Sequence, residues 1–238
     1  MNLKHSLFGL LTSVLISCHS NSSERETYLD LKIAGAMRNV MWKGELGSNI
    51  DLDTIWDKNG LYGIGPVSYL RGELLINNGK SYVSRVTSDS SMSLEETFEI
   101  SAPFFVYGNV KDWNEIELPA QVKTLQDLEQ FIDEQTKNFK RPFAFKLTGQ
   151  VSNAIIHIQN LPEGTSVSSP DEAHQGQINY ELENEEVEIV GFFSTEHQGV
   201  FTHHDSFVHM HLITKDETKM GHLDELEIGK MNLLLPKK

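Results

Sequence analysis

Three histidines near the end of the sequence have the residue type and the spacing of metal ligands. His209 and His211 lie two positions apart in "SFVHMHLI", and His222 follows after the polar stretch "TKDETKMG". Alternate side chains of a β-strand share one face, so His209 and His211 should both reach one cation. A hairpin would return His222 beside them, and three imidazoles with an open fourth position are a common way of holding catalytic zinc.

The same pattern also has a plainer interpretation. H-x-H pairs occur on exposed strands without any ligand, and the chain contains 10 histidines, so a cluster can arise from composition alone. His197, His203 and His204 lie close by in the sequence and could supply a ligand or none. The spacing by itself leaves a metal site and a coincidence equally open.

The segments that must position these histidines are mainly β-prone. From Phe143 onward, stretches such as "FAFKLTGQVSNAIIHI" and "EVEIVGFFST" alternate or run apolar, with turn residues between them. These patterns predict strands. The second part of the chain, residues 141–238, is therefore expected to be a β-rich lobe that carries the metal ligands.

The first part of the chain is more mixed. It contains a short helix expected around residues 36–43 and β-prone segments joined by the hairpin turn at residues 77–80, "NNGK". An amphipathic helix begins after Thr124, whose side chain is a typical N-cap with Asp127 three residues on. We expect an α+β protein, with a mixed β-sheet and helices in a lobe at residues 28–140.

The composition argues against some classes of function. The 238 residues include 20 Lys and Arg against 34 Asp and Glu, which gives a formal net charge of -14. Such a surface repels phosphate backbones, and no basic stripe with aromatics is present, so nucleic-acid binding is not expected. The single cysteine, Cys18, excludes an intrachain disulfide and a thiolate zinc site.

The N-terminus has the pattern of an export signal. Lys4 precedes an apolar run that is too short to span a bilayer, so residues 1–17 are expected to be a signal peptide. The segment "LISC" resembles the lipobox of bacterial lipoproteins, with Cys18 as the lipid-bearing residue, and residues 18–27 would form a polar tether. We expect an exported protein, anchored to the cell envelope by its lipid alone. A plain signal peptide with an incidental cysteine is the alternative.

Two separated segments together resemble the α-acetolactate decarboxylase family. "GLYGIGPVSYLRGELLINNGKSYV" resembles the block in which a glycine-punctuated strand leads to a Gly-Glu pair. "EIVGFFS" followed by "FVHMHLITKDETKMGHLDEL" resembles the closing block, in which H-x-H and a later Gly-His bind the metal. The similarity extends weakly from about residue 28 to residue 236.

The resemblance implies a reaction and a set of roles. His209, His211 and His222 would hold Zn²⁺ or another divalent metal, and the substrate would be 2-acetolactate or a related 2-hydroxy-3-oxo acid, converted to acetoin and CO2. A Lewis acid on the substrate oxygens stabilises the charge that develops as CO2 leaves. Glu73 matches the family's active-site glutamate and would carry a proton or orient the substrate. The resemblance also implies two lobes with the metal site between them, and a homodimer.

The sequence departs from the family pattern at two places. Lys146 stands where the family has an arginine that holds the substrate carboxylate, and lysine lacks the planar fork of that group. The family's C-terminal tail glutamate has no counterpart after Glu227, and Glu225 and Glu227 are the nearest candidates. These departures support a second hypothesis, a non-catalytic envelope protein on the same fold that binds a divalent metal or a small organic acid. A structural envelope protein without metal is a third.

Overall fold

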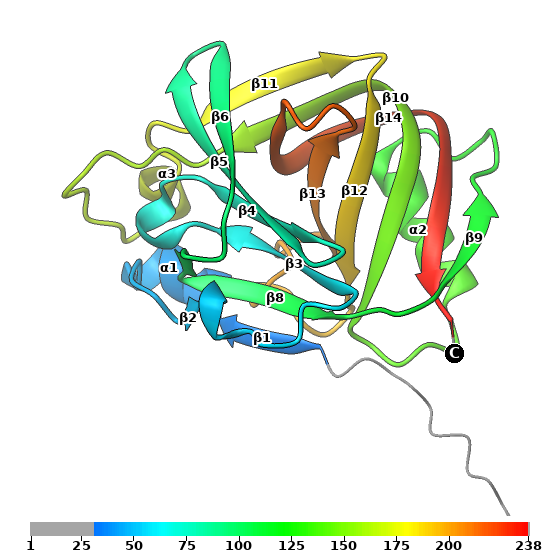
Figure 1. Ribbon diagram of the computed structural model, residues 1–238, viewed down its shortest axis with the longest axis horizontal. Helices are drawn as coiled ribbons and strands as arrows, with labels where there is room; N and C mark the ends of the chain where they lie inside the picture. The colour runs from blue at the N-terminus through cyan, green and yellow to red at the C-terminus, as the bar shows by residue number, and fades with distance from the viewer. Residues whose placement is uncertain (1–30, 238) are drawn as a thin grey trace, which may run out of the picture.

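The computed structural model describes residues 31–237, which form two six-stranded sheets packed against each other (Figure 1). The expected signal peptide (residues 1–17) and the tether (residues 18–27), which includes Cys18, lie outside the described residues. Within residues 31–237, no helix is long and apolar enough to cross a membrane. The α+β fold class expected from the sequence is confirmed, with the candidate metal ligands between the two sheets.

The first sheet is built mainly from hairpins. Its strands, in spatial order, are β1 (Lys32–Gly35), β8 (Phe104–Asn109), β3 (Leu61–Pro66), β4 (Glu73–Asn77), β5 (Lys80–Ser88) and β6 (Ser91–Glu96). The expected turn between β4 and β5 is present, with Asn78 and Gly79 at φ 50° and 82°. The sequence suggested a mixed sheet, but every pairing here is antiparallel. Short connections between β3, β4, β5 and β6 allow only that arrangement.

The second sheet closes on itself. Its strands are β11 (Ile178–Glu183), β10 (Phe143–Ile158), β12 (Glu186–Phe193), β13 (Val208–Thr214), β14 (Met220–Pro236) and β9 (Trp113–Glu117). The long strand β10 pairs with β12 on one side and with β14 on the other. Because β12 pairs with β13 and β13 with β14, these four strands form a small closed barrel. Closure fixes the strands that carry the histidines by pairing them on both sides.

The second sheet also recruits residues from before position 140. Strand β9 pairs with the end of β14, and helix α2 (Leu125–Gln135) buries Leu128 and Ile132 in the core of this sheet. Helix α2 begins as expected, because Thr124 and Asp127 form a reciprocal capping box. The sheets therefore do not divide at residue 140, where the sequence analysis placed the boundary.

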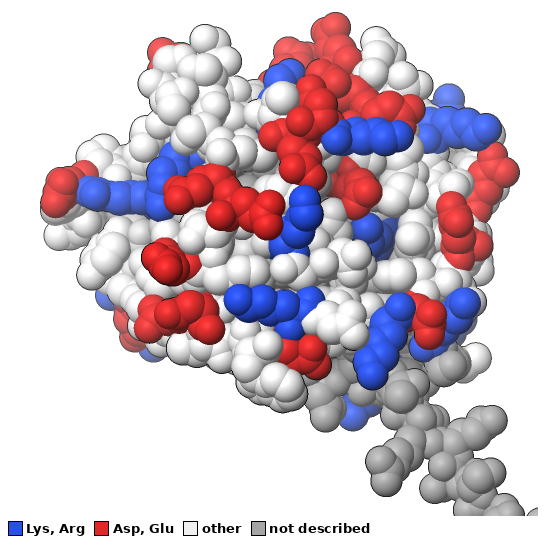
Figure 2. Space-filling view, in the orientation of Figure 1, with Lys and Arg blue, Asp and Glu red and all other residues white. Residues whose placement is uncertain are grey.

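The remaining elements are short and cover the ends of the sheets. They are the helices α1 (Met37–Lys43) and α3 (Pro170–Ala173), the two-stranded sheet of β2 (Ile50–Asp51) and β7 (Ser101–Ala102), and two 3-10 turns at Leu52–Thr54 and Ser68–Leu70. Helix α1 lies where the sequence predicts one. Figure 2 shows lysine and arginine side chains interspersed with aspartate and glutamate on the face drawn.

An apolar layer joins the two sheets, and we call it the sheet seam. It consists of buried side chains from both sheets, among them Ile64 and Leu75 from the first and Val190, Phe192 and Ile213 from the second. All five are 0 to 3% exposed. Since Val190 pairs with His211 across β12 and β13, the histidine face of the barrel is the face turned toward the seam.

Candidate metal centre

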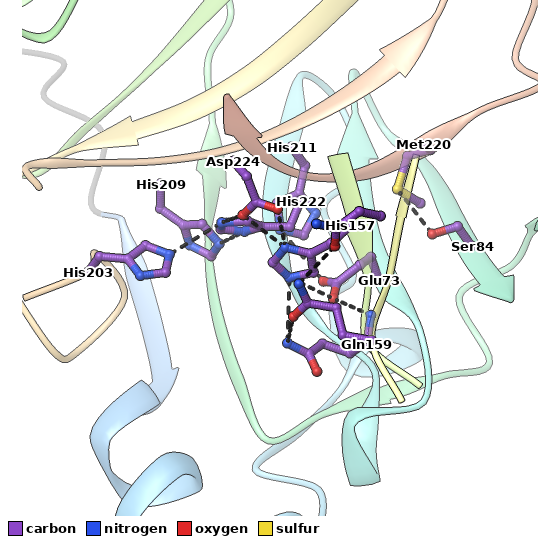
Figure 3. A network of polar contacts seen from close by, with 12 residues as sticks. Glu73, Ser84, His157, Gln159, His203, His209, His211, Met220, His222 and Asp224 are labelled. Carbon is purple, nitrogen blue, oxygen red and sulfur yellow. Dashed lines mark hydrogen bonds and ion pairs between the residues drawn. The ribbon is translucent and has the colours of Figure 1, made fainter. Parts of the chain in front are cut away.

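Strands β13 and β14 bring the three candidate ligands together. His211 pairs directly with His222 across the two strands, and His209 lies on the same face two positions before His211. The Nε2 atom of His209 is 3.1 Å from Nδ1 of His222. One ring nitrogen of each histidine lies within 4.8 Å of the others, and all three side chains are buried (Figure 3). The hairpin expected from the sequence therefore places the imidazoles around a common point.

Gly221 explains why the third ligand follows a glycine. A Cβ atom at this position would lie 2.5 Å from the backbone oxygen of His157 on β10. Only glycine lets β14 approach β10 this closely, since real Cβ atoms essentially never come within 3.0 Å of another heavy atom. Gly221 thus allows the close strand approach that positions His222 beside β10.

The electrostatics of the cluster favour neutral imidazoles. Burial, followed by the neighbouring histidines, holds the pKa of His209 and of His222 well below the ordinary value of 6.5. Burial lowers the pKa of His211 to about 3. The neutral imidazole is the form that binds a metal ion, and it is the form these side chains take at neutral pH.

The residues present fit a divalent transition metal. Nε2 of His211 and Nδ1 of His209 are buried without a hydrogen-bond partner. Buried polar atoms of this kind are rare, and a cation among the three imidazoles would supply the missing interaction at His211. An all-imidazole donor set suits zinc and several other first-row metals.

Glu73 reaches the cluster from the opposite sheet. It lies on β4, is 2% exposed, and places Oε2 at 3.7 Å from Nε2 of His211. Its Oε1 accepts a hydrogen bond from the backbone N–H of Gln159 at 3.2 Å and is 3.9 Å from Nε2 of His157. Burial raises the pKa of Glu73 well above its usual range. The carboxyl group therefore keeps its proton at a pH where an exposed glutamate has lost it.

His157 belongs to the cluster and was not foreseen. It lies on β10 directly opposite His222, and the two rings are 4.6 Å apart. Its Nδ1 is 2.7 and 2.9 Å from the two carboxylate oxygens of Asp224 on β14. In the sequence His157 sits within the apolar run "AIIHI", where no second ligand at strand spacing draws attention to it.

Of the three neighbouring histidines left open by the sequence, one joins the cluster. Nε2 of His203 lies 3.2 Å from Nε2 of His222. His204 points away, with 91% of its side chain exposed, and His197 bonds to the Ser194 hydroxyl. The cluster thus extends from the loop before β13, through β13 and β14, to β10.

Comparisons with known proteins agree with this geometry. The sequence profile of the family described as "Alpha-acetolactate decarboxylase" matches residues 35–237. This chain belongs to the alpha-acetolactate decarboxylase family. An alpha-acetolactate decarboxylase of Lactococcus lactis is 30% identical over 172 residues, covering 70% of this chain and 67% of the relative. One of Brevibacillus brevis is 24% identical over 197 residues, covering 82% and 66%. The chain thus spans about two thirds of the length of these curated relatives.

Solved structures show the same fold. The alpha-acetolactate decarboxylase of Bacillus subtilis strain 168 superposes with a TM-score of 0.71 at 21% identity, covering 87% of this chain and 86% of that one. A Staphylococcus aureus protein described as similar to alpha-acetolactate decarboxylase gives a TM-score of 0.73 at 18% identity, with the same coverage. At these identities the superpositions establish the architecture alone.

Lys146, the residue expected in place of the family arginine, contacts two residues outside the histidine cluster. Lys146 on β10 donates a hydrogen bond to Glu188 at 2.9 Å and lies 5.6 Å from the ring centre of Tyr62. It pairs with Val190 and Leu234, whereas His157, eleven residues further along β10, pairs with His222. Among the described contacts, those of Lys146 are with Glu188 and Tyr62, and the basic side chain of β10 that contacts the cluster is His157.

The acid that β14 brings to the cluster also differs from expectation. Asp224, two residues after His222, lies 3.7 Å from Nε2 of His222 in addition to its contacts with His157. Glu225 and Glu227, the nearest candidates in the sequence, are exposed on β14. They pair with Ile155 and Asn153 of β10. The register shift between Ile155 and Ile156 leaves Asp224 unpaired with β10, and this bulge accounts for the direction of its carboxylate toward His157 and His222.

Two cavities meet at the histidines. A small cavity of about 30 Å³ lies on the Glu73 side and is lined by Met37 and Met41 of α1. A larger cleft of about 490 Å³ lies on the Asp224 side. His203, His209 and His222 line both. The smaller cavity has room for an ion or a water molecule but not for an organic acid.

Proposed function

We propose that this protein is a metal-dependent decarboxylase of 2-acetolactate or of a closely related 2-hydroxy-3-oxo acid. The observation that carries the proposal is the buried Glu73 carboxyl, which faces His211 at 3.7 Å beside three neutral candidate ligands. Membership of the alpha-acetolactate decarboxylase family supports the same reaction. His209, His211 and His222 would hold the metal, with zinc as the first candidate, and the bound ion would act as a Lewis acid toward the substrate oxygens.

Glu73 is suited to handle the proton that the reaction requires. When the carboxylate leaves as CO2, the electron pair left on the substrate must be met by a proton on carbon to give acetoin. A carboxyl whose pKa is raised by burial retains its proton to a higher pH than an exposed glutamate and can donate it. The Gln159 backbone N–H fixes one oxygen of Glu73, so the other faces His211. Glu73 thus combines a usable proton with a fixed position.

Helix α1 would have to move for a substrate to reach Glu73. Met37 and Met41 of this helix line the cavity beside Glu73, whose volume of about 30 Å³ is too small for a 2-hydroxy-3-oxo acid. Methionine side chains are unbranched and adapt easily to a changed shape. Displacement of these two side chains would widen the cavity over the cluster without disturbing the paired strands.

We further propose that the protein is exported and anchored to the bacterial envelope through a lipid on Cys18, and that it forms a homodimer. The segment "LISC" at residues 15–18 supports the anchor. Fractionation of cells that express the full chain tests it, because the Cys18→Ser variant should leave the membrane fraction. Sedimentation of the purified protein tests the dimer.

The proposed activity is tested by metal analysis and turnover together. The purified protein is assayed for bound metal and for CO2 and acetoin release from racemic acetolactate, with a His209→Ala/His211→Ala variant as control. Stoichiometric metal and turnover that the variant lacks would support the decarboxylase. Metal without turnover on acetolactate or its homologues would favour the non-catalytic binding protein instead.

A further inference from the structure

His222 presents its two ring nitrogens to two different sets of potential ligands. Nδ1 faces His209 at 3.1 Å, which is the side of the three-histidine set. Nε2 faces away from that set, toward His203 at 3.2 Å and an oxygen of Asp224 at 3.7 Å. A ligand of a single metal ion needs only one of these sides, so the donors around Nε2 require their own explanation.

The atoms around Nε2 have the spacing of a coordination sphere. His157, His222 and Asp224 each offer an atom within 4.8 Å of the others. Oδ1 of Asp224 lies 2.9 Å from Nδ1 of His157 and 3.7 Å from Nε2 of His222, and Nε2 of His222 lies 3.2 Å from Nε2 of His203. Donor atoms of a tetrahedral zinc site lie about 3.3 Å apart, given bond lengths of roughly 2.0 Å. His157, His222 and Asp224 are already close to this spacing, whereas His203 contacts only His222 of the set and its ring must move toward Asp224 to enclose an ion.

We propose that His157, His203, Asp224 and Nε2 of His222 form a second divalent-metal site, which shares His222 with the first. Three imidazoles and a carboxylate suit zinc and its first-row neighbours. Binding of the second ion displaces the remaining ring proton of His222 to solvent, and the imidazole then bridges the two ions. Asp224 moves from hydrogen-bond acceptor of His157 to metal ligand. This site does not depend on the decarboxylase activity.

The two sites differ in their access to solvent. The side chain of Asp224 is 30% exposed, and together with His203 it lines the open cleft of about 490 Å³. His209 and His211, by contrast, are almost fully buried. An ion can therefore reach the second site directly from the cleft. It should exchange faster than an ion at the first site and be removed first by a chelator.

Metal counting in the full-length protein tests the second site. The protein, loaded with Zn²⁺ and desalted, should hold two equivalents by mass spectrometry of the metal. The variant Asp224→Asn/His203→Ala should hold one, and so should His209→Ala/His211→Ala. His204→Ala is the matched control, because His204 neighbours His203 but is exposed, and it should hold two. One equivalent in the unmodified protein, or two in Asp224→Asn/His203→Ala, would overturn the proposal.

Electron paramagnetic resonance tests the shared ligand. With Cu²⁺ in both sites, an imidazole bridge should couple the two spins, so that the signal of isolated Cu²⁺ is lost. The variants Asp224→Asn/His203→Ala and His209→Ala/His211→Ala, which each lack one of the two sites, should show the isolated signal of one ion. Two bound ions without coupling would show that His222 does not bridge them. Circular dichroism of each variant establishes that it is folded. The single variant Asp224→Asn is nearly isosteric, and its metal content gives a second test of the site.

Discussion

The carboxyl of Glu73 lies 3.7 Å from Nε2 of His211, although the two residues belong to different sheets. Neither sheet contains the proposed proton donor together with the metal ligands. Glu73 stands at the start of β4, and His211 is in the middle of β13. The apolar packing of the seam holds the two sheets at this separation, so the site depends on how the sheets are placed against each other.

Replacement of Glu73 by glutamine should separate proton transfer from metal binding. Glutamine keeps the shape of the side chain and its capacity to accept from the Gln159 N–H, but it has no carboxyl proton to give. We expect turnover to fall by about 10²- to 10⁴-fold, with the metal content unchanged. Glu163→Gln, at an exposed glutamate, should change neither quantity. Full activity in Glu73→Gln would exclude the role proposed for this side chain.

Gly221→Ala should weaken metal binding without touching a ligand. The added methyl group would meet the His157 carbonyl at 2.5 Å and push β14 away from β10, which displaces His222. We expect metal affinity to fall by roughly 10- to 100-fold, as for other changes that misorient a ligand. Gly229→Ala is the control. Gly229 is also on β14, and its added methyl group would meet the Gln150 carbonyl of β10 at 2.7 Å, away from the cluster. Equal affinity in both variants would refute the explanation of the Gly-His pair.

The metal-free protein should lose stability on acidification below neutral pH. The pKa values of His209, His211 and His222 are depressed in the folded state, so between the folded value and 6.5 the unfolded chain binds more protons. Stability then falls as pH falls, by about 1.4 kcal/mol per pH unit for each such histidine. Thermal unfolding of chelator-treated protein from pH 7.5 to pH 5 measures this slope.

Glu73 acts in the opposite direction in the same pH range. Because its pKa is raised, the folded state holds a proton that the unfolded chain has lost above about pH 4.5, so this group becomes less destabilising as pH falls. Three histidines outweigh one glutamate. The Glu73→Gln variant should therefore show a steeper loss of stability on acidification than the unmodified protein. A shallower loss would contradict the raised pKa.

Lys146 should matter for stability rather than for turnover. Its ammonium group pairs with Glu188, which also accepts a hydrogen bond from Asn77, and within residues 31–237 no contact joins it to the histidines. Lys146→Met should lower the free energy of unfolding by about 1 kcal/mol, since the Glu188 side chain is partly exposed and solvent screens the pair. Activity should stay within a few-fold. Lys146→Arg should not raise activity, and a marked rise would place this residue in the substrate site after all.

The sequence predicted the features that follow strict local rules. The alternation of His209 and His211, the Asn-Gly turn and the Thr124 cap are each determined by a few neighbouring residues, and the structure has all three elements. The return of His222 needed only a hairpin. Glu73 was assigned from the resemblance, because nothing near it in the chain indicates that it lies against β13.

His157 could not be predicted because its position depends on irregularities in β10. The register between β10 and β14 shifts at three places between Gln150 and Ile156. One of these shifts skips Ser152 of β10, so counting by twos from Lys146 does not lead to His157, although both residues end up on the outer side of the barrel. Bulges of this kind are set by the partner strands, and the sequence of one strand does not reveal them.

The position of the site between two sheets means that its chemistry can be adjusted from a distance. Val190 pairs with both His211 and Lys146 and packs in the seam against the first sheet, yet its apolar side chain has no atom that could bind a metal or carry a proton. Protein interiors are close-packed, so a side chain larger by one methylene group, as in Val190→Ile, must shift its neighbours. Sequence change in this layer can therefore alter the distance over which Glu73 delivers its proton, while every residue of the centre stays the same.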